Sequence, residues 1–283
     1  MILGLDTWHA YRVDWSRVAA DGLRFAWVRC TEAAGIVDPG YLGSVAGAKA
    51  AGLYVGAYAP LHVSADPDAQ VAHFLRHWAD VGTRVGELPP ALDLEVPWTW
   101  EPIGRDLVRA RIVRAVQMLA EHVGRPPAIY TSSGWWRGLS DGATPEETAT
   151  LAACPLWAAA YPMARPWTPP EGATMRGFGP WSRVLVWQYS GSHSVPMPGV
   201  TSSACSQSGQ AGHGPCQMVD RDVWLGTEAE LRDLAMMPPE PATMPGIDAP
   251  PPTLPEGVGT VDPGEGLADW AVEAHQRDRD NDT

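Results

Sequence analysis

The segment at residues 91–100, "ALDLEVPWTW", carries two carboxylates two positions apart at the end of an apolar run. Residues i and i+2 of a β-strand point to the same face, so Asp93 and Glu95 are predicted to lie side by side. Two carboxylates held together in a partly desolvated site cannot easily both ionise, so one pKa rises. Cleavage of a glycosidic bond needs such a pair, in which one group protonates the leaving oxygen and the other stabilises positive charge.

Three further carboxylates fall at predicted strands that are far apart in the sequence. Asp6 ends the first predicted strand, Glu32 ends the second, and Asp220 lies in the last. Asp222 is two residues from Asp220, and either of them could point inward. In a β/α barrel the catalytic groups gather at the C-terminal ends of the strands, so we expect these carboxylates and the acidic pair to share one mouth.

The elements that must position these groups alternate along the chain. Eight apolar runs rich in β-forming residues are predicted as strands: 2–8, 25–32, 54–61, 90–95, 127–132, 156–161, 184–190 and 217–224. Helical patterns lie between and after them, at 14–22, 38–52, 66–82, 105–124, 144–153 and 227–237. This alternation predicts a parallel sheet buried on both faces, and eight strands favour a (β/α) barrel over an open sheet. Residues 162–183 and 191–216 read as loops, so some helices of the second half are expected to be missing.

The helical patterns also predict which side chains face the core and where two helices begin. Apolar stripes are predicted at Val71, Phe74, Leu75 and Trp78 on one long helix, and at Leu107, Val113, Val116 and Leu119 on the next. Thr227 and Glu230 have the spacing of a capping box, and Pro145 follows Thr144 at a predicted first turn.

The sequence offers only weak evidence for a zinc site or a nucleophilic serine. His73 and His77 are four residues apart on one predicted helix face, but Phe74 stands where HExxH zinc enzymes carry glutamate. We therefore favour a solvent-facing histidine pair. The letters G-x-S-x-G occur once, as "GLSDG" at residues 138–142, but five residues separate them from the predicted strand 127–132, whereas a nucleophile elbow is a tight turn directly after a strand, so a serine hydrolase is not favoured. No metal and no other cofactor is predicted.

The four cysteines are too few for a disulfide scaffold. Cys30 and Cys154 lie in or beside apolar runs and are predicted to be buried free thiols. Cys205 and Cys216 bracket a Gly/Ser-rich loop, which either one disulfide closes or which carries two free thiols. His213 adds only a weak zinc signal, because paired CxxC spacing is missing.

Charge and composition narrow the classes of partner. The 283 residues carry a formal net charge of −13, which disfavours nucleic acid and anionic membrane surfaces as partners. No apolar run approaches the roughly 20 residues of a membrane helix, and the start "MILGLDTWHA" lacks the features of a Sec signal. We expect a monomer that is made in the cytoplasm. Residues 1–236 are predicted as the catalytic barrel, 237–266 as a Pro/Gly-rich linker and 267–283 as a short helical or disordered acidic tail.

Several motifs in register give a more specific signal. The sequence contains, in order, "GLDTWHAYRVDW", "VRCTEAAGIVDPGY", "AGLYVGAYAP", "DAQVAHF", "ALDLE", "AIYTSSGWW", "LWAAAY", "VWQYSG" and "VDRDVW". Over roughly residues 2–226 the chain resembles glycoside hydrolase family 25, the lysozymes or N-acetylmuramidases of phage endolysins and bacterial autolysins. The resemblance implies an irregular, flattened TIM-like (β/α) barrel that hydrolyses the β-1,4 bond between N-acetylmuramic acid and N-acetylglucosamine.

The resemblance also implies roles for the carboxylates. Glu95 matches the proton donor, Asp93 the partner carboxylate, Asp6 the acid of the first strand and Asp220 that of the last. Whether Asp93 attacks the sugar or assists the substrate's own acetamido group is open, and we lean to acetamido participation by analogy with the family. Two departures, Ala33 where the family often has glycine and Ala59 where it often has histidine, bear on substrate preference.

Groups near the strand ends are candidates for binding sugar. The predicted substrate-binding residues are Glu32, Tyr58, Trp98, Tyr130 and Gln188. Trp8 and Trp100 are further candidates for sugar-stacking faces, whereas Trp157 is at least as well explained by core packing, and Glu32 equally by a structural ion pair.

The sequence thus predicts a lysozyme that acts on the peptidoglycan strands of the cell wall, as a phage endolysin or a lysin carried in a virion. Two alternatives stay open. One is a non-catalytic glycan-binding or virion structural protein on the same fold. The other is a different acetamido-sugar glycosidase, although the DxxDxDxE motif of chitinase-like barrels is absent.

Overall fold

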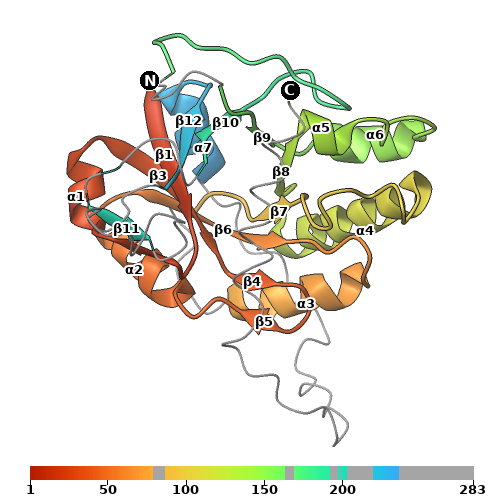
Figure 1. Cartoon of the computed structure of the whole chain (residues 1–283), viewed down its shortest axis with the longest axis horizontal. Coiled ribbons are helices and arrows are strands. Elements are labelled where there is room, and N and C mark those ends of the chain that lie inside the picture. Colours follow the sequence, from red (N-terminus) through yellow and green to blue (C-terminus); the bar gives the residue numbers. More distant parts are fainter. Residues whose placement is uncertain (79–86, 163–168, 192–196, 198, 203–218, 236–283) are drawn as a thin grey trace, which may run out of the picture. The chain divides into compact units, whose positions relative to one another are not determined.

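The computed structural model describes residues 1–78, 87–162, 169–191, 197, 199–202 and 219–235, and a closed eight-stranded barrel forms its centre (Figure 1). The predicted linker and tail, and the loop that carries Cys205 and Cys216, lie outside the described residues. The α/β barrel expected from the sequence is confirmed.

Each of the eight predicted strands contributes one strand to the barrel. These are β1 (Ile2–Thr7), β3 (Leu23–Arg29), β6 (Tyr54–Pro60), β7 (Ala91–Asp93), β8 (Ala128–Ser132), β9 (Leu156–Ala159), β10 (Val186–Ser190) and β12 (Asp220–Trp224). Around the barrel their order is β1-β12-β10-β9-β8-β7-β6-β3. The expectation of an all-parallel sheet is wrong in one place, because β12 runs antiparallel to both of its neighbours, β1 and β10.

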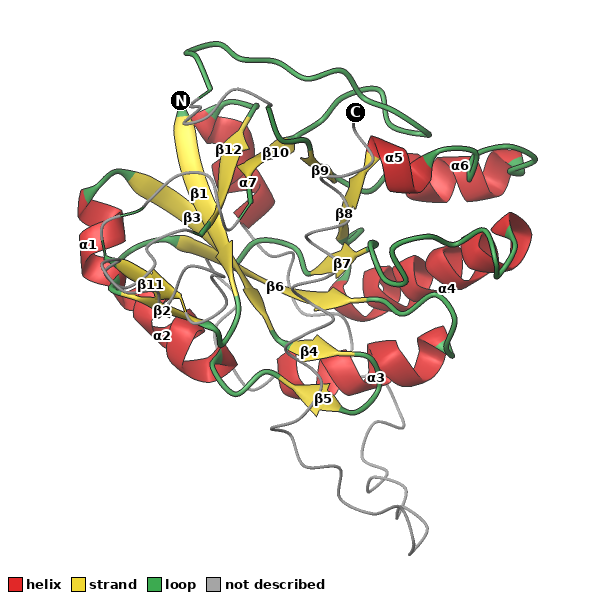
Figure 2. Ribbon diagram, in the orientation of Figure 1, coloured by secondary structure: helices red, strands yellow, loops and turns green. Residues whose placement is uncertain are grey.

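Helices cover the outside of the barrel unevenly (Figure 2). They are α1 (Trp15–Ala20), α2 (Tyr41–Ala50), α3 (Pro67–Trp78), α4 (Arg105–Val123), α5 (Ser133–Trp136), α6 (Pro145–Ala152) and α7 (Glu228–Ala235). The part of the chain described between β9 and β10 contains no helix, as the sequence indicated for the second half. Two small sheets were not predicted: β2 (Tyr11–Val13) with β11 (Val200–Ser202), and β4 (Thr31–Glu32) with β5 (Ile36–Val37).

Local signals explain where several helices begin and end. The Thr227 hydroxyl accepts the Glu230 backbone N–H at 3.1 Å, and the Glu230 carboxylate accepts the Thr227 N–H at 2.8 Å, which is the predicted capping box of α7. Thr144 and Glu147 form the same box at the start of α6. α4 is capped by Gly124, whose φ of +80° is left-handed and whose N–H donates to the Ala120 carbonyl at 2.8 Å.

The helices pack on the barrel through apolar stripes. On α3 the predicted stripe faces the core: three of its members are buried, Val71, Phe74 and Trp78, and Leu75 is half-buried. On α4 the prediction is wrong at Leu107, which is 47% exposed, because Val108 one position further on faces the core instead. The stripe of α4 then continues through buried residues that follow at helical spacing: Ile112, Ala115, Val116, Leu119 and Val123.

Aromatic rings fill the inside of the barrel. The indoles of Trp27 and Trp157 stack with centroids 4.9 Å apart, and Phe25, Tyr58 and Tyr130 meet them edge-on. Trp157 is therefore a core residue and does not line a sugar site. These rings are buried, so polar groups that lie among them inside the barrel are held in a desolvated setting.

Glycine makes room for one of these indoles. A Cβ placed on Gly56 of β6 would lie 2.4 Å from Nε1 of Trp27, which is closer than carbon and nitrogen can approach. The Trp27 indole cannot easily move away, because its N–H donates to the Pro89 carbonyl at 3.1 Å. Gly56 is therefore required by the packing of the barrel interior.

Candidate active site

The structure brings the predicted carboxylates to one end of the barrel. Asp6 is the penultimate residue of β1, Asp93 is the last residue of β7, and Asp220 is the first residue of the antiparallel β12, so all three lie at the same rim. Asp6 and Asp220 are directly paired across β1 and β12. All three are buried, and the charges of Asp6, Glu95 and Glu32 each raise the pKa of Asp93.

The two members of the acidic pair have different surroundings. β7 ends at Asp93, so Glu95 follows the strand instead of belonging to it, and Glu95 is half-buried whereas Asp93 is buried. Burial, and then the charge of Glu95, raises the pKa of Asp93 well above its usual range, although Arg29 opposes the shift. The Oδ1 atom of Asp93 receives no hydrogen bond from the described residues, which is consistent with a neutral carboxyl. The structure therefore assigns the raised pKa to Asp93.

Gln188 connects the first strand to two tyrosines. Its amide nitrogen donates to Asp6 Oδ2 at 2.7 Å, and its amide oxygen accepts the hydroxyls of Tyr130 at 2.8 Å and Tyr161 at 2.5 Å. Tyr130 and Gln188, which were predicted to bind sugar, are buried in this network. Tyr58, predicted for the same role, is also buried and packs inside the barrel. Burial is the main reason that the pKa values of all three tyrosines are raised well above the usual range. Tyr161 was not predicted as a site residue, although it ends a predicted strand.

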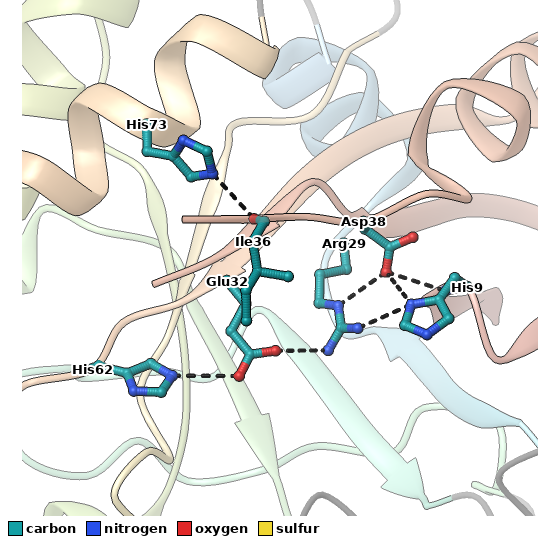
Figure 3. A network of polar contacts seen from close by, with 7 residues as sticks. All are labelled: His9, Arg29, Glu32, Ile36, Asp38, His62 and His73. Carbon is teal, nitrogen blue, oxygen red and sulfur yellow. Dashed lines mark hydrogen bonds and ion pairs between the residues drawn. The ribbon is translucent and has the colours of Figure 1, made fainter. Parts of the chain in front are cut away.

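A second polar network surrounds Arg29 at the end of β3 (Figure 3). The guanidinium donates through Nε to Asp38 at 3.0 Å and through Nη1 to Glu32 at 3.1 Å. His9 contacts Asp38 at 3.0 Å, and His62 contacts the other oxygen of Glu32 at 3.4 Å. Both oxygens of Glu32 are therefore held by protein groups, which favours the ion-pair interpretation of this residue. Arg29 and Asp38 were not predicted.

The tryptophans proposed for sugar stacking fall into separate environments. Trp98, in the segment that follows Glu95, is 38% exposed. Trp8 is partly buried and lies beneath the Arg29 guanidinium, 4.3 Å from the ring centroid. Trp100 is buried and donates its indole N–H to a backbone carbonyl at 2.6 Å, so it is a core residue and cannot offer a face to a sugar. Trp98 is the most exposed of these three tryptophans.

The histidines of α3 do not form the predicted solvent-facing pair. His73 is buried and contacts the Ile36 carbonyl of the β4–β5 hairpin at 3.1 Å, and this burial lowers its pKa. Helix periodicity alone could not reveal that a hairpin covers this face. The described residues contain no group of three or more acidic, histidine or cysteine side chains placed to hold a metal ion. Cys30 and Cys154 are buried free thiols, as expected.

Comparison with known proteins agrees with this geometry. The family described as glycosyl hydrolases family 25 matches residues 7–198, and the chain belongs to that family. The class of protein is thus a glycoside hydrolase built on a closed barrel. None of the helices described is long and apolar enough to cross a membrane.

Particular relatives include both a lysozyme and a protein of unassigned activity. Lysozyme M1 of Streptomyces globisporus is 26% identical over 83% of this chain and 71% of its own length. Uncharacterized protein YegX of Escherichia coli O157:H7 is 27% identical over 78% of this chain and 68% of its own, and for the K12 protein the match spans 54% of its length.

Solved structures support the fold. The family GH25 lysozyme from Aspergillus fumigatus, 25% identical, aligns with a TM-score of 0.58 over 83% of this chain and 98% of that one. The bacterial lysozyme from Streptomyces coelicolor, 24% identical, aligns with a TM-score of 0.61 over 83% and 96% of the two chains.

Proposed function

We propose that this protein is a lysozyme that hydrolyses the β-1,4 bond between N-acetylmuramic acid and N-acetylglucosamine in peptidoglycan. Its family and its similarity to Lysozyme M1 support the class of reaction. The observation that carries the proposal is the carboxylate cluster at the barrel rim, in which buried Asp93 with a raised pKa lies beside half-exposed Glu95.

Glu95 is the proton donor in this proposal, and Asp93 assists it. Burial and the charge of Glu95 raise the pKa of Asp93, so the protonation of one carboxyl depends on the charge of the other. Asp93 is buried whereas Glu95 is half-exposed, so Glu95 is the member of the pair that is placed to contact the oxygen between two sugars. A proton retained by the pair can therefore be delivered through Glu95, which leaves Asp93 charged beside the sugar or its acetamido group.

The remaining acids stabilise the positive charge that develops on the sugar ring. Asp6 and Asp220 face each other across β1 and β12 and complete the negative rim. Gln188 donates to Asp6 and so favours its charged form. Trp98, which is partly exposed in the segment after Glu95, offers an aromatic face to a sugar ring.

A turbidity assay on purified peptidoglycan tests the assignment. The Glu95→Gln variant should clear about 10²–10⁴-fold more slowly, because general acid catalysis contributes about that factor. The matched control is Glu101→Gln, which makes the same change at an exposed position of the following turn and should clear at the wild-type rate. Equal clearing by Glu95→Gln and the wild type would refute the role of Glu95, and no clearing by the wild type would favour the glycan-binding alternative.

The bond that is cut needs a separate measurement. Mass analysis of the released muropeptides should find N-acetylmuramic acid at the new reducing end. N-acetylglucosamine at that end would instead indicate a different acetamido-sugar glycosidase. The anomeric form of the fresh product, followed by NMR, distinguishes retention, which acetamido participation requires, from inversion.

The proposed activity also implies where the protein acts, because its substrate is part of the bacterial cell wall. We propose that the protein works as a monomer on the glycan strands of the cell wall, as a phage endolysin or virion-associated lysin. Size-exclusion chromatography with light scattering tests the first statement. Lysis of intact bacteria by protein added from outside, compared with protein expressed inside, tests whether the wall is reached from either side.

A further inference from the structure

Asp222 is a buried acid that the proposed reaction does not use. It lies on β12, two residues after Asp220, and its side chain is completely buried. In the barrel it is paired with Gly4 of β1 and with Gln188 of β10. It therefore lies one step deeper in the barrel than the rim acids Asp6 and Asp220, on the same inner face.

The two oxygens of Asp222 have unequal partners. Oδ1 accepts the indole N–H of Trp157 at 2.7 Å. Oδ2 is buried and receives no hydrogen bond from any donor among the described residues. A charged carboxylate with one bare oxygen in this desolvated interior is costly, particularly beside the acid of the neighbouring strand. If Oδ2 carries a proton, it becomes a donor. Asp6 lies on the same inner face of the adjacent strand β1, two residues along from the Gly4 that pairs with Asp222, and Gln188, which pairs with Asp222, donates to Asp6.

We propose that Asp222 is held as a neutral carboxylic acid whose proton is donated to Asp6, and that it is thereby a positioning residue for the charged Asp6 of the site. In this proposal Asp6 receives a hydrogen bond from Asp222 on β12 in addition to the one from the Gln188 amide on β10. The catalytic consequence of this arrangement rests on the proposed lysozyme function, whereas the protonation of Asp222 does not.

The charges that face Asp222 agree with this assignment. Burial raises the pKa of Asp222 well above its usual range, and the charges of Asp6 and then Asp220 raise it further, while the Trp157 hydrogen bond opposes the shift. Tyr189, on β10, is a further titratable neighbour, and its pKa is raised by burial and by the charge of Asp222, while the Arg221 guanidinium opposes the shift.

Two substitutions distinguish a neutral acid from a charged one. Asp222→Asn keeps an oxygen for Trp157 and supplies N–H to Asp6, so it should clear peptidoglycan within about threefold of the wild type. Asp220→Asn, the same change at the rim, should lose about 10²-fold or more, since a charge aimed at the transition state is removed. A folded Asp222→Asn variant that loses as much as Asp220→Asn would overturn the proposal.

A third substitution tests whether Asp222 acts through Asp6. Asp222→Leu is close in size but cannot donate, so activity should fall about ten- to a hundredfold, the rate equivalent of a hydrogen bond to a charged group. Asp6 would then hold its proton to higher pH, and the acid limb of the pH–rate profile should move upward. Asp222→Asn should leave the acid limb in place, a difference between the two variants that a purely structural role of Asp222 does not predict. An acid limb that does not move in a folded Asp222→Leu variant would contradict the action of Asp222 through Asp6.

Infrared spectroscopy gives a readout that needs no activity. The difference spectrum between the wild type and Asp222→Asn at neutral pH should contain the C=O stretch of a protonated carboxyl. A carboxylate signal in its place would overturn the proposal even if the enzyme is a lysozyme. A protonated signal would support it even if the protein clears no peptidoglycan.

Discussion

At the scale of single residues, Ala33 is the clearest point of backbone strain. Its φ of +51° is left-handed, and among the described residues other than glycine no second one has a positive φ. Ala33 follows Glu32 in the β4–β5 hairpin, so this conformation turns the chain directly after a site residue. A side chain in left-handed backbone costs about 1–2 kcal/mol, which gives a physical reason for the glycine often found here in the family.

Ala33→Gly should therefore stabilise the protein. The relieved strain exceeds the extra entropy that glycine adds to the unfolded chain, so the free energy of unfolding should rise by about 0.5–1 kcal/mol, measured by urea denaturation. Ala149→Gly, the same change inside α6 at an exposed position, should lower it by about 1 kcal/mol. Two losses of equal size would show that the turn at residue 33 carries no strain.

The sequence predicts some site residues better than others for a physical reason. Asp6, Asp93 and Asp220 lie at strand ends, and the geometry of a barrel brings strand ends together whatever the loops do. Asp38 and Tyr161 contribute through the paths of their loops, which no local pattern records. Asp222 could be named from the sequence, but its role depends on which donors surround it.

At the scale of elements, the barrel strands were predictable and their directions were not. A strand that is buried on both faces reads as an apolar run in either direction, so β12 gave no sign that it is antiparallel. The β2–β11 pair joins residues 11–13 to 200–202, and such distant pairing leaves no local trace. The stripe on α4 was misplaced by one residue because Leu107 and Val108 are both apolar and only packing distinguishes them.

Gly56→Ala tests the tight packing of β6 against the aromatic interior. The new methyl group would lie 2.4 Å from Trp27 Nε1 and 3.0 Å from Leu88 Cβ, so Trp27 must leave its stack on Trp157. We expect a loss of about 1–3 kcal/mol in the free energy of unfolding, and a change in the near-UV circular dichroism of tryptophan.

Gly43→Ala is the matched control for this change. A Cβ on Gly43 in α2 meets nothing within 4 Å, so helix propensity alone should stabilise the protein by up to about 1 kcal/mol. If both alanine variants behave alike, the barrel interior accommodates a methyl group and the packing account is wrong.

At the scale of the whole molecule, buried acids make stability depend on pH in an unusual direction. Asp93 and Asp222 both have pKa values raised well above the ordinary value near 3.8. Between that value and their native pKa values, the folded protein binds more protons than the unfolded chain. The free energy of unfolding contributed by these groups is therefore fully present at acid pH and is lost as the pH rises through the native pKa values.

Urea unfolding across the pH range measures this effect. Each unit by which a native pKa exceeds the unfolded value should remove about 1.4 kcal/mol by the time the group is ionised. Asp222→Asn removes one titrating acid, so its free energy of unfolding should fall less with rising pH, and it should exceed the wild type in stability at alkaline pH. Parallel curves for the two proteins would mean that Asp222 does not titrate differently in the folded state.

The antiparallel contact between β1 and β12 has a consequence for biosynthesis. Asp6 leaves the ribosome more than two hundred residues before Asp220, and the two meet only when β12 is inserted. A nascent polypeptide that has not yet supplied β12 has neither a closed barrel nor the full set of rim carboxylates. The pairing of Asp6 with Asp220 is therefore made only after β12 has been synthesised, and chains that terminate before β12 are released without it.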